Sequence, residues 1–156
     1  MVVATPSDES ETRLLLSTCY QYPGPASVRY PRGAGCGAAE SAGLETVEVG
    51  RGVVRREGRK IAILGFGTLV SAALAAADKL DATVADMRFV KPIDRELILD
   101  LAARHDALVT LEDASIMGGA GSAVLETLSA AGVQTPVLQL GLSLIHISEP
   151  TRPERI

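Results

Sequence analysis

The sequence contains no tryptophan and few other aromatic residues, which limits how its apolar core can be built. Aromatic side chains make up 3% of the 156 residues, although hydrophobic residues reach 47%. The core must therefore consist of alanine, valine, leucine and isoleucine. A chain of this length has room for about one ordinary domain, since domains typically hold roughly 100–200 residues.

The sequence also lacks any long block of charge of one sign, and it has few cysteines. With a net charge of -4, it gives no electrostatic basis for binding nucleic acid or a membrane surface, and we expect neither as a partner. Cys19 and Cys36 are too few for a disulfide framework or a metal knuckle, which favours a reducing cytosol. No signal peptide follows Met1 and no apolar run approaches about 18 residues, so no membrane span is predicted.

From residue 46 onward, apolar runs alternate with helical patterns, as is typical of an open, largely parallel α/β sheet. The run Ile61–Leu64 is apolar at every position, which indicates a strand buried on both faces. Further strands are expected at 47–54, 82–90, 107–113 and 137–141, and helices at 69–80, after the N-cap Asp94 and at 121–130.

The first residues form a separate pattern. The apolar run Val2–Thr5 is closed by a proline, and Ser7 is predicted to cap the helix that follows. A turn sequence ends that helix, and the strand-like stretch VRYPRG comes next. The glycine-rich residues beyond it have no period and indicate a linker.

Two glycine-containing turns are candidates for binding chemistry. In LGFGT, Gly65 and Gly67 lie between a strand and a helix, as in a dinucleotide-binding turn, and Asp86 is spaced to bind a ribose. Val70 occupies the third glycine position of that fingerprint. A tight structural turn is therefore the favoured interpretation.

The second glycine turn lies in EDASIMGGAGSAV, between a predicted strand and a helix. Glu112 and Asp113 end the strand, and Gly118, Gly119 and Gly121 open the helix. Such a turn can cradle an anion, but this one has no lysine or arginine to neutralise it. A structural turn with close backbone packing is again favoured.

VRYPRG places Arg29 and Arg32 near the end of a short strand, where ligands tend to bind in α/β sheets. Guanidinium groups bind phosphate bidentately and stay charged. From the residues alone, two arginines on a solvated strand edge remain the simpler interpretation.

Three motifs together favour a phosphate-binding role over a solvated strand edge: TPSDE, VRYPRG and RFVKPID. ATPSDESETRLLLSTCYQYPGPASVRYPRG resembles the stretch that closes the pyrimidine-binding domain of 1-deoxy-D-xylulose-5-phosphate synthases. DMRFVKPIDRELILDLAARHDALVTLEDASIMGGAGSAVLETL resembles the C-terminal domain of the same family. Transketolases and the pyruvate dehydrogenase β subunit share the fold but not the three motifs together.

The resemblance implies an α/β fold like that of the transketolase C-terminal domain: a largely parallel open sheet with flanking helices, preceded by the last helix and strands of a pyrimidine-binding domain. It divides the chain into the end of the pyrimidine-binding domain (1–36), a linker (37–46) and a truncated transketolase C-terminal-like domain (47–142). Met1 is then expected to be an internal residue of a longer enzyme.

Residues 143–156 have neither the composition nor the periodicity of the rest. LSLIHISEPTR resembles, letter for letter, the translation of a transposon-type sequencing adapter, so this segment is predicted to be non-native. His146, Ser148 and Glu149 are accordingly excluded from any site.

The family that the chain resembles consists of cytoplasmic, bacterial transferases of the transketolase type. The resemblance implies a homodimer that serves isoprenoid, thiamine and pyridoxal biosynthesis. It condenses pyruvate with glyceraldehyde 3-phosphate, with loss of carbon dioxide, using thiamine diphosphate and Mg²⁺. The resemblance gives Arg29 the role of substrate-phosphate ligand, with Arg32 in support. It assigns no catalytic, cofactor-binding or metal-binding residue to this chain, so we expect the chain alone to be inactive and to bind no cofactor.

Two alternatives stay open at this point. One is a stand-alone nucleotide-binding module that uses Gly65, Gly67 and Asp86. The other is a structural dimerisation domain of a different transketolase-like enzyme.

Overall fold

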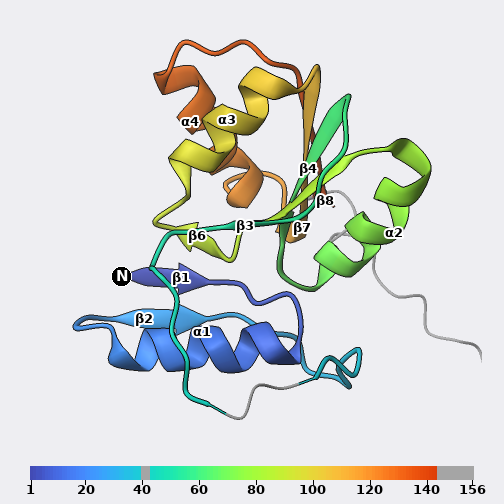
Figure 1. The fold of residues 1–156 in the computed structure, drawn as a ribbon. Helices are drawn as coiled ribbons and strands as arrows, with labels where there is room; N and C mark the ends of the chain where they lie inside the picture. The colour runs from blue at the N-terminus through green and yellow to red at the C-terminus, as the bar shows by residue number, and fades with distance from the viewer. Residues whose placement is uncertain (40–42, 144–156) are drawn as a thin grey trace, which may run out of the picture.

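The computed structural model describes residues 1–39 and 43–143, and it contains two β-sheets (Figure 1). The smaller sheet has the order β2–β1–β6, in which β1 pairs parallel with β2 and antiparallel with β6. The strands are β1 (Val2–Ala4), β2 (Ala26–Val28) and β6 (Phe89–Lys91). A strand that follows the predicted linker thus completes the sheet of the first segment.

The larger sheet has the order β3–β5–β4–β7–β8, with every pair parallel except β3 with β5. Its strands are β3 (Val53–Arg56), β4 (Ile61–Phe66), β5 (Thr83–Asp86), β7 (Ala107–Ser115) and β8 (Val137–Leu142). The expected α/β architecture, with a largely parallel open sheet and flanking helices, is confirmed.

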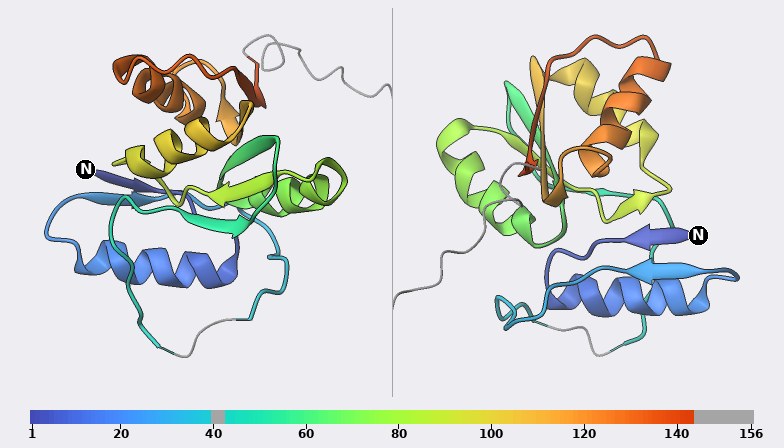
Figure 2. Two further views of the ribbon diagram at one scale, coloured as in Figure 1. Left: turned by 45° about the horizontal axis from the view of Figure 1, so that its top comes forward. Right: turned by 180° about the vertical axis from the view of Figure 1, so that it is seen from behind.

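Helices cover both faces of the larger sheet (Figures 1 and 2). Helix α2 (Val70–Leu80), entered through a 3-10 turn at Gly67–Leu69, packs on one face, while α3 (Arg95–Arg104) and α4 (Ala120–Ala130) pack on the other. Alternate residues of β4 serve the two cores, since Ala62 and Leu64 face α3 and α4 whereas Ile63 faces α2. The continuous apolar run of β4 is therefore buried on both faces, as predicted.

Helix α1 (Glu9–Gln21) packs against the smaller sheet. Leu15 of this helix is fully buried with Val2, Ala4 and Phe89. The predicted N-cap at Ser7 is wrong: the side chain of Asp8 accepts a 2.8 Å hydrogen bond from the backbone N–H of Glu11. The hydroxyl of Ser7 does not cap the helix, because it donates a hydrogen bond to the buried carboxylate of Asp86.

The single strand expected over 82–90 is two strands in different sheets, β5 and β6. The chain turns between them at Arg88, whose φ is 56°. The guanidinium of Arg88 is held by Glu11 of α1, and its carbonyl accepts a hydrogen bond from the N–H of Thr5. A tertiary contact therefore interrupts a locally continuous β pattern.

Other boundaries shift by smaller amounts. The strand expected over 47–54 begins only at Val53, since the residues before it form a turn at Gly50 with a φ of 86°. Asp94 caps α3 as predicted, with its side chain accepting from the N–H of Leu97. Residues 144–156, with His146, Ser148 and Glu149, lie outside the described residues, so the predicted adapter origin of 143–156 stays a prediction.

Candidate functional site

The carboxyl ends of β4 and β7 meet at the point where the order of the larger sheet reverses. From β4 the chain passes through α2 to β5 on one side, whereas β7 lies on the other side of β4. Ligands of open α/β sheets bind in the crevice outside such strand ends. Gly67 and Thr68 follow β4 here, and Asp113 lies near the end of β7.

Arg29 lies over this point, directly after β2. Its backbone N–H donates a 2.8 Å hydrogen bond to the carbonyl of Ala4, and its guanidinium donates to the carbonyl of Asp113. A cavity of about 60 Å³ adjoins the guanidinium, and we call it the strand-end crevice; its lining residues are Pro6, Arg29, Tyr30, Pro31, Gly67, Thr68 and Asp113.

The guanidinium of Arg29 keeps most of its hydrogen-bonding capacity. The residue is exposed, and within the described part of the chain its side chain forms no ion pair. A guanidinium has five N–H donors in a fixed fork. Its single carbonyl partner leaves donors and an un-neutralised charge for an anionic ligand.

Arg32 is not brought into the same place. It is exposed and does not line the strand-end crevice. The structure therefore brings Arg29 to the strand ends and leaves Arg32 outside them.

The turn with Gly65 and Gly67 has a structural role, because it lets β4 and α2 pack closely together. A Cβ on Gly65 would lie 2.7 Å from a methyl carbon of Val70, so strand and helix approach too closely for a side chain. Gly67 has a φ of 79°, which favours glycine. Asp86 is fully buried and bonded to Ser7 and Arg55, and it is therefore not placed to bind a ribose.

The second glycine turn already holds an anion, which is a carboxylate of the chain itself. The two side-chain oxygens of Glu112 accept hydrogen bonds of 2.8 Å from the N–H of Ala120 and 2.9 Å from the N–H of Gly121. Glu112 is 3% exposed. It satisfies the free donors at the start of α4 and occupies the place that an external anion would take.

A cluster of charges around the buried carboxylates of Glu11 and Asp86 joins the first segment to the larger sheet, and the sequence did not reveal it. Arg88 binds the carboxylate of Glu11 in a bidentate pair with distances of 2.8 and 2.6 Å. Arg55 bridges Glu11 at 3.0 Å and Asp86 at 3.3 Å. We call these residues, with Ser7, the polar junction.

Burial dominates the electrostatics of Asp86 in the polar junction. Desolvation raises the pKa of its carboxyl above the ordinary value of 3.8, and the hydroxyl of Ser7, which donates at 2.7 Å, opposes that shift. The charge of Glu11 raises the pKa further, whereas Arg55 lowers it. Its hydrogen-bonded pairs lie up to 79 positions apart in the sequence, so no local motif could have predicted their contact.

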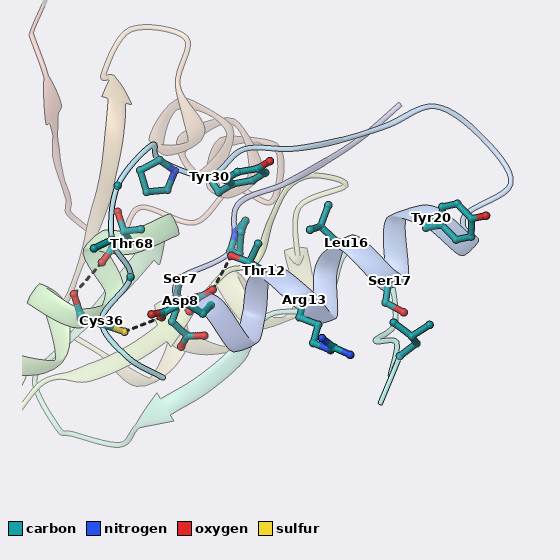
Figure 3. Close-up of a pocket in the computed structure, with 18 of the residues that line it drawn as sticks. Ser7, Asp8, Thr12, Arg13, Leu16, Ser17, Tyr20, Tyr30, Cys36 and Thr68 are labelled. Carbon is teal, nitrogen blue, oxygen red and sulfur yellow. Dashed lines mark hydrogen bonds between the residues drawn. The ribbon is translucent and has the colours of Figure 1, made fainter. Parts of the chain in front are cut away.

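A hollow of about 980 Å³ runs along α1 (Figure 3). Leu16 and Tyr20 project from α1 along it and are exposed, and Tyr30 lies across from Leu16. Pro31 also lines the hollow. At the start of α1, the carboxylate of Glu9 accepts from the N–H of Gly37 and from the thiol of Cys36. The hydrogen bond from Gly37, followed by those from the backbone of Glu9 and the thiol of Cys36, lowers the pKa of Glu9 to about 2.

Neither a metal site nor a membrane span is found in the part of the chain that the structure describes. It contains no group of three or more His, Cys, Asp or Glu side chains that could hold a metal ion. None of its helices is long and apolar enough to cross a bilayer. Cys19 and Cys36 are both free thiols.

Comparison with known proteins points to one enzyme family. Over 142 residues, or 91% of the chain, it is 80% identical to the 1-deoxy-D-xylulose-5-phosphate synthase of Bordetella parapertussis. It is 63% identical over 143 residues, 92% of the chain, to that of Neisseria gonorrhoeae. The aligned part is 23% and 22% of these two relatives, so the chain spans about a quarter of their length.

A solved structure and a family model give the fold. One solved structure is described as "split gene transketolase, inactive beta4 tetramer", and it matches this chain with a TM-score of 0.78 and 35% identity. The match covers 92% of this chain and 48% of that one. Residues 50–154 match the family model described as transketolase, C-terminal domain. The resemblance predicted from TPSDE, VRYPRG and RFVKPID is confirmed, and the chain belongs to the transketolase C-terminal domain family.

Proposed function

We propose that the chain is the C-terminal part of a 1-deoxy-D-xylulose-5-phosphate synthase. This enzyme condenses pyruvate with glyceraldehyde 3-phosphate and releases carbon dioxide. The observation that carries the proposal is the 80% identity to such a synthase over 142 residues. The placement of Arg29 at the strand ends supports it.

In this proposal Arg29 binds the phosphate of glyceraldehyde 3-phosphate. The Asp113 carbonyl orients the guanidinium, and the Arg29 backbone is fixed to β1 through Ala4. A phosphate dianion complements the remaining N–H donors, and a charge-assisted bidentate contact gives both affinity and orientation. Arg29 would therefore position the aldehyde without taking part in proton transfer.

The cofactors belong to other segments of the proposed enzyme. When bound there together with Mg²⁺, thiamine diphosphate would supply the electron sink for decarboxylation. The described residues offer no metal-binding group that fits this ion. We therefore propose that the chain alone binds neither group and is inactive.

The proposed division of the chain follows from the same family. Residues 1–36 close a pyrimidine-binding domain, 37–46 link it to the C-terminal domain of 47–142, and 143–156 are non-native. The exposed side of α1 at Leu16 and Tyr20 would be covered by the rest of the pyrimidine-binding domain. The complete enzyme would be a cytoplasmic bacterial homodimer serving isoprenoid, thiamine and pyridoxal biosynthesis.

A chimera tests the proposal directly. Residues 1–142 replace the aligned segment of the Bordetella parapertussis synthase, and formation of 1-deoxyxylulose 5-phosphate is measured. We expect activity close to that of the parent. A chimera that folds and binds thiamine diphosphate but makes no product would contradict the proposal.

The role of Arg29 is tested in that active chimera. Arg29→Ala removes a contact of roughly 1.5–3 kcal/mol, so kcat/KM for the aldehyde should fall by about one to two orders of magnitude. Pyruvate carries no phosphate, and its KM should stay unchanged. Arg29→Lys should recover part of the loss, because a point charge cannot reproduce the fork.

Arg32→Ala is the matched control, since Arg32 is exposed and outside the crevice. It should cost less than Arg29→Ala. If the two variants behave alike, or if Arg29→Ala affects pyruvate and spares the aldehyde, Arg29 is not the phosphate ligand.

A further inference from the structure

Thr68 brings a hydroxyl group from the larger sheet to the strand-end crevice. It lies in the 3-10 turn Gly67–Leu69, through which the chain passes from β4 into α2. A Cβ on Gly67 would lie 3.8 Å from the carbonyl oxygen of Pro6, so this turn packs against the first segment. Thr68 and Arg29 both line the crevice. The larger sheet and the first segment therefore each contribute a polar side chain to it.

The hydroxyl of Thr68 is free to bind a ligand. The backbone carbonyl of Thr68 already accepts a 3.0 Å hydrogen bond from the hydroxyl of Ser71 (Figure 3). The side-chain hydroxyl is half-buried and forms no hydrogen bond with any residue that the structure describes. A hydroxyl has one donor and two acceptor lone pairs. It can therefore donate to a ligand without giving up a contact within the chain.

The other crevice residues offer no second donor close to Arg29. Three of them have no side-chain donor: Pro6, Pro31 and Gly67. The hydroxyl of Tyr30 is directed away from Thr68 (Figure 3). An ionised carboxylate such as that of Asp113 only accepts hydrogen bonds and repels an anion. An anion bound beside Arg29 thus needs another donor, and Thr68 provides it.

We propose that the hydroxyl of Thr68 donates a hydrogen bond to the phosphate that Arg29 binds, and that Thr68 thereby positions the aldehyde substrate. The inference rests on the proposed function, in which this phosphate belongs to glyceraldehyde 3-phosphate. The crevice of about 60 Å³ has room for a few water molecules. A phosphoryl group fits such a space, and the carbon chain of the aldehyde must then extend out of it.

The chemistry of the phosphate matches these two side chains. A phosphate monoester has three acceptor oxygens, and the fork of a guanidinium takes two of them. The third oxygen remains for the hydroxyl of Thr68. The transketolase C-terminal-like domain thus takes part in substrate recognition, with Arg29 contributed by the first segment.

Substitution of Thr68 in the active chimera tests the inference. Thr68→Val replaces the hydroxyl by a methyl group and breaks no hydrogen bond of the side chain to the described residues. We expect kcat/KM for glyceraldehyde 3-phosphate to fall about tenfold, mainly through KM, because one hydrogen bond to a charged group is lost. The KM for pyruvate should stay unchanged. Thr68→Ser keeps the hydroxyl and should restore most of the loss.

An aldehyde without a phosphate separates recognition from a structural role. With D-glyceraldehyde as the acceptor, Thr68→Val should leave kcat/KM unchanged, because this substrate lacks the group that Thr68 binds. Equal losses with the two aldehydes would overturn the inference. So would a Thr68→Ser enzyme as impaired as Thr68→Val.

Ser71→Ala is the matched control. Ser71 carries a hydroxyl three positions after Thr68, and it is exposed and lines the hollow along α1 but not the crevice. This variant should retain its kcat/KM for glyceraldehyde 3-phosphate. A loss equal to that of Thr68→Val would mean that the shape of the turn matters and not the Thr68 hydroxyl, and the inference would be overturned.

The comparison with Arg29→Ala separates this inference from the proposed function. If Arg29→Ala loses activity with the aldehyde and Thr68→Val does not, the proposed role of Arg29 stands and the role of Thr68 is overturned. If neither variant changes kcat/KM for the aldehyde, the phosphate binds elsewhere and both assignments are overturned.

Discussion

The polar junction and the strand-end crevice each depend on an arginine, but the surroundings of the two arginines differ. In the junction, Arg88 is 14% exposed and its charge is neutralised by the bidentate carboxylate of Glu11. At the crevice, Arg29 is exposed and bonded to a backbone carbonyl, which carries no formal charge. One guanidinium is satisfied inside the molecule, and the other is oriented but remains charged and available.

This difference separates structural from recognition roles for the same residue type. A buried, paired arginine cannot bind a ligand without breaking contacts that hold the two sheets together. An arginine held by a neutral partner can add a ligand at little cost. Substitutions in the junction should therefore change stability, whereas substitutions at the crevice should change binding.

The largest loss of stability is expected for Arg88→Ala. It leaves the carboxylate of Glu11 buried with less compensation, which destabilises a protein by about 3–5 kcal/mol. Urea unfolding of the chain measures the change. Arg104→Ala is the matched control, because its ion pair with Asp100 is exposed and exposed ion pairs contribute little to stability. Equal losses in the two variants would mean that the junction is not structural.

The next largest loss of stability is expected for Glu112→Ala. The N–H groups of Ala120 and Gly121 would lose their acceptor in a buried place, at a cost of about 1–3 kcal/mol. Glu112→Gln keeps one acceptor oxygen and should cost less. Thermal unfolding followed by circular dichroism compares them, and a neutral Glu112→Ala would show that water replaces the carboxylate.

A smaller effect should appear in the pH dependence of stability. Because burial raises the pKa of Asp86, the folded chain binds this proton more tightly than the unfolded chain. The resulting stability is complete below the ordinary pKa of 3.8 and is lost as the pH rises through the folded-state pKa. The stability of the native chain relative to Asp86→Asn should therefore fall over this interval. Urea midpoints that differ by a constant amount at every pH would contradict the raised pKa.

The smallest effect on stability is expected for Arg29→Ala. An exposed side chain with one carbonyl partner should change the free energy of unfolding by no more than about 0.5 kcal/mol. The same urea experiment measures it. A loss as large as that of Arg88→Ala would place Arg29 among the structural arginines and remove the contrast between the two regions.

Much of the fold follows from local patterns in the sequence. The two-sided burial of β4 and the cap at Asp94 depend on neighbouring residues, and both are confirmed. The errors at Ser7 and Arg88 have one cause: each side chain is held by a partner more than 70 positions away. Local propensity cannot anticipate a contact of that kind.

The candidate site was less accessible to sequence reasoning. The family motif pointed to Arg29, but its Asp113 partner and the crevice result from the meeting of four separate segments. The glycine turn before α4 had the composition of an anion site and no signal that Glu112 fills it. That carboxylate reaches the helix from the preceding strand, eight and nine positions before its partners.

The pairing of β1 with β6 has a consequence for the order of folding. The hydrogen bond from the Arg29 guanidinium to Asp113 joins residues 84 positions apart, and distant contacts form late because chain closure is costly in entropy. We therefore expect the larger sheet to form first, the first segment to dock onto β6 next, and the crevice to appear last. Pulse-labelling hydrogen exchange should protect the amide of Leu64 before that of Arg29, and the reverse order would refute this sequence of events.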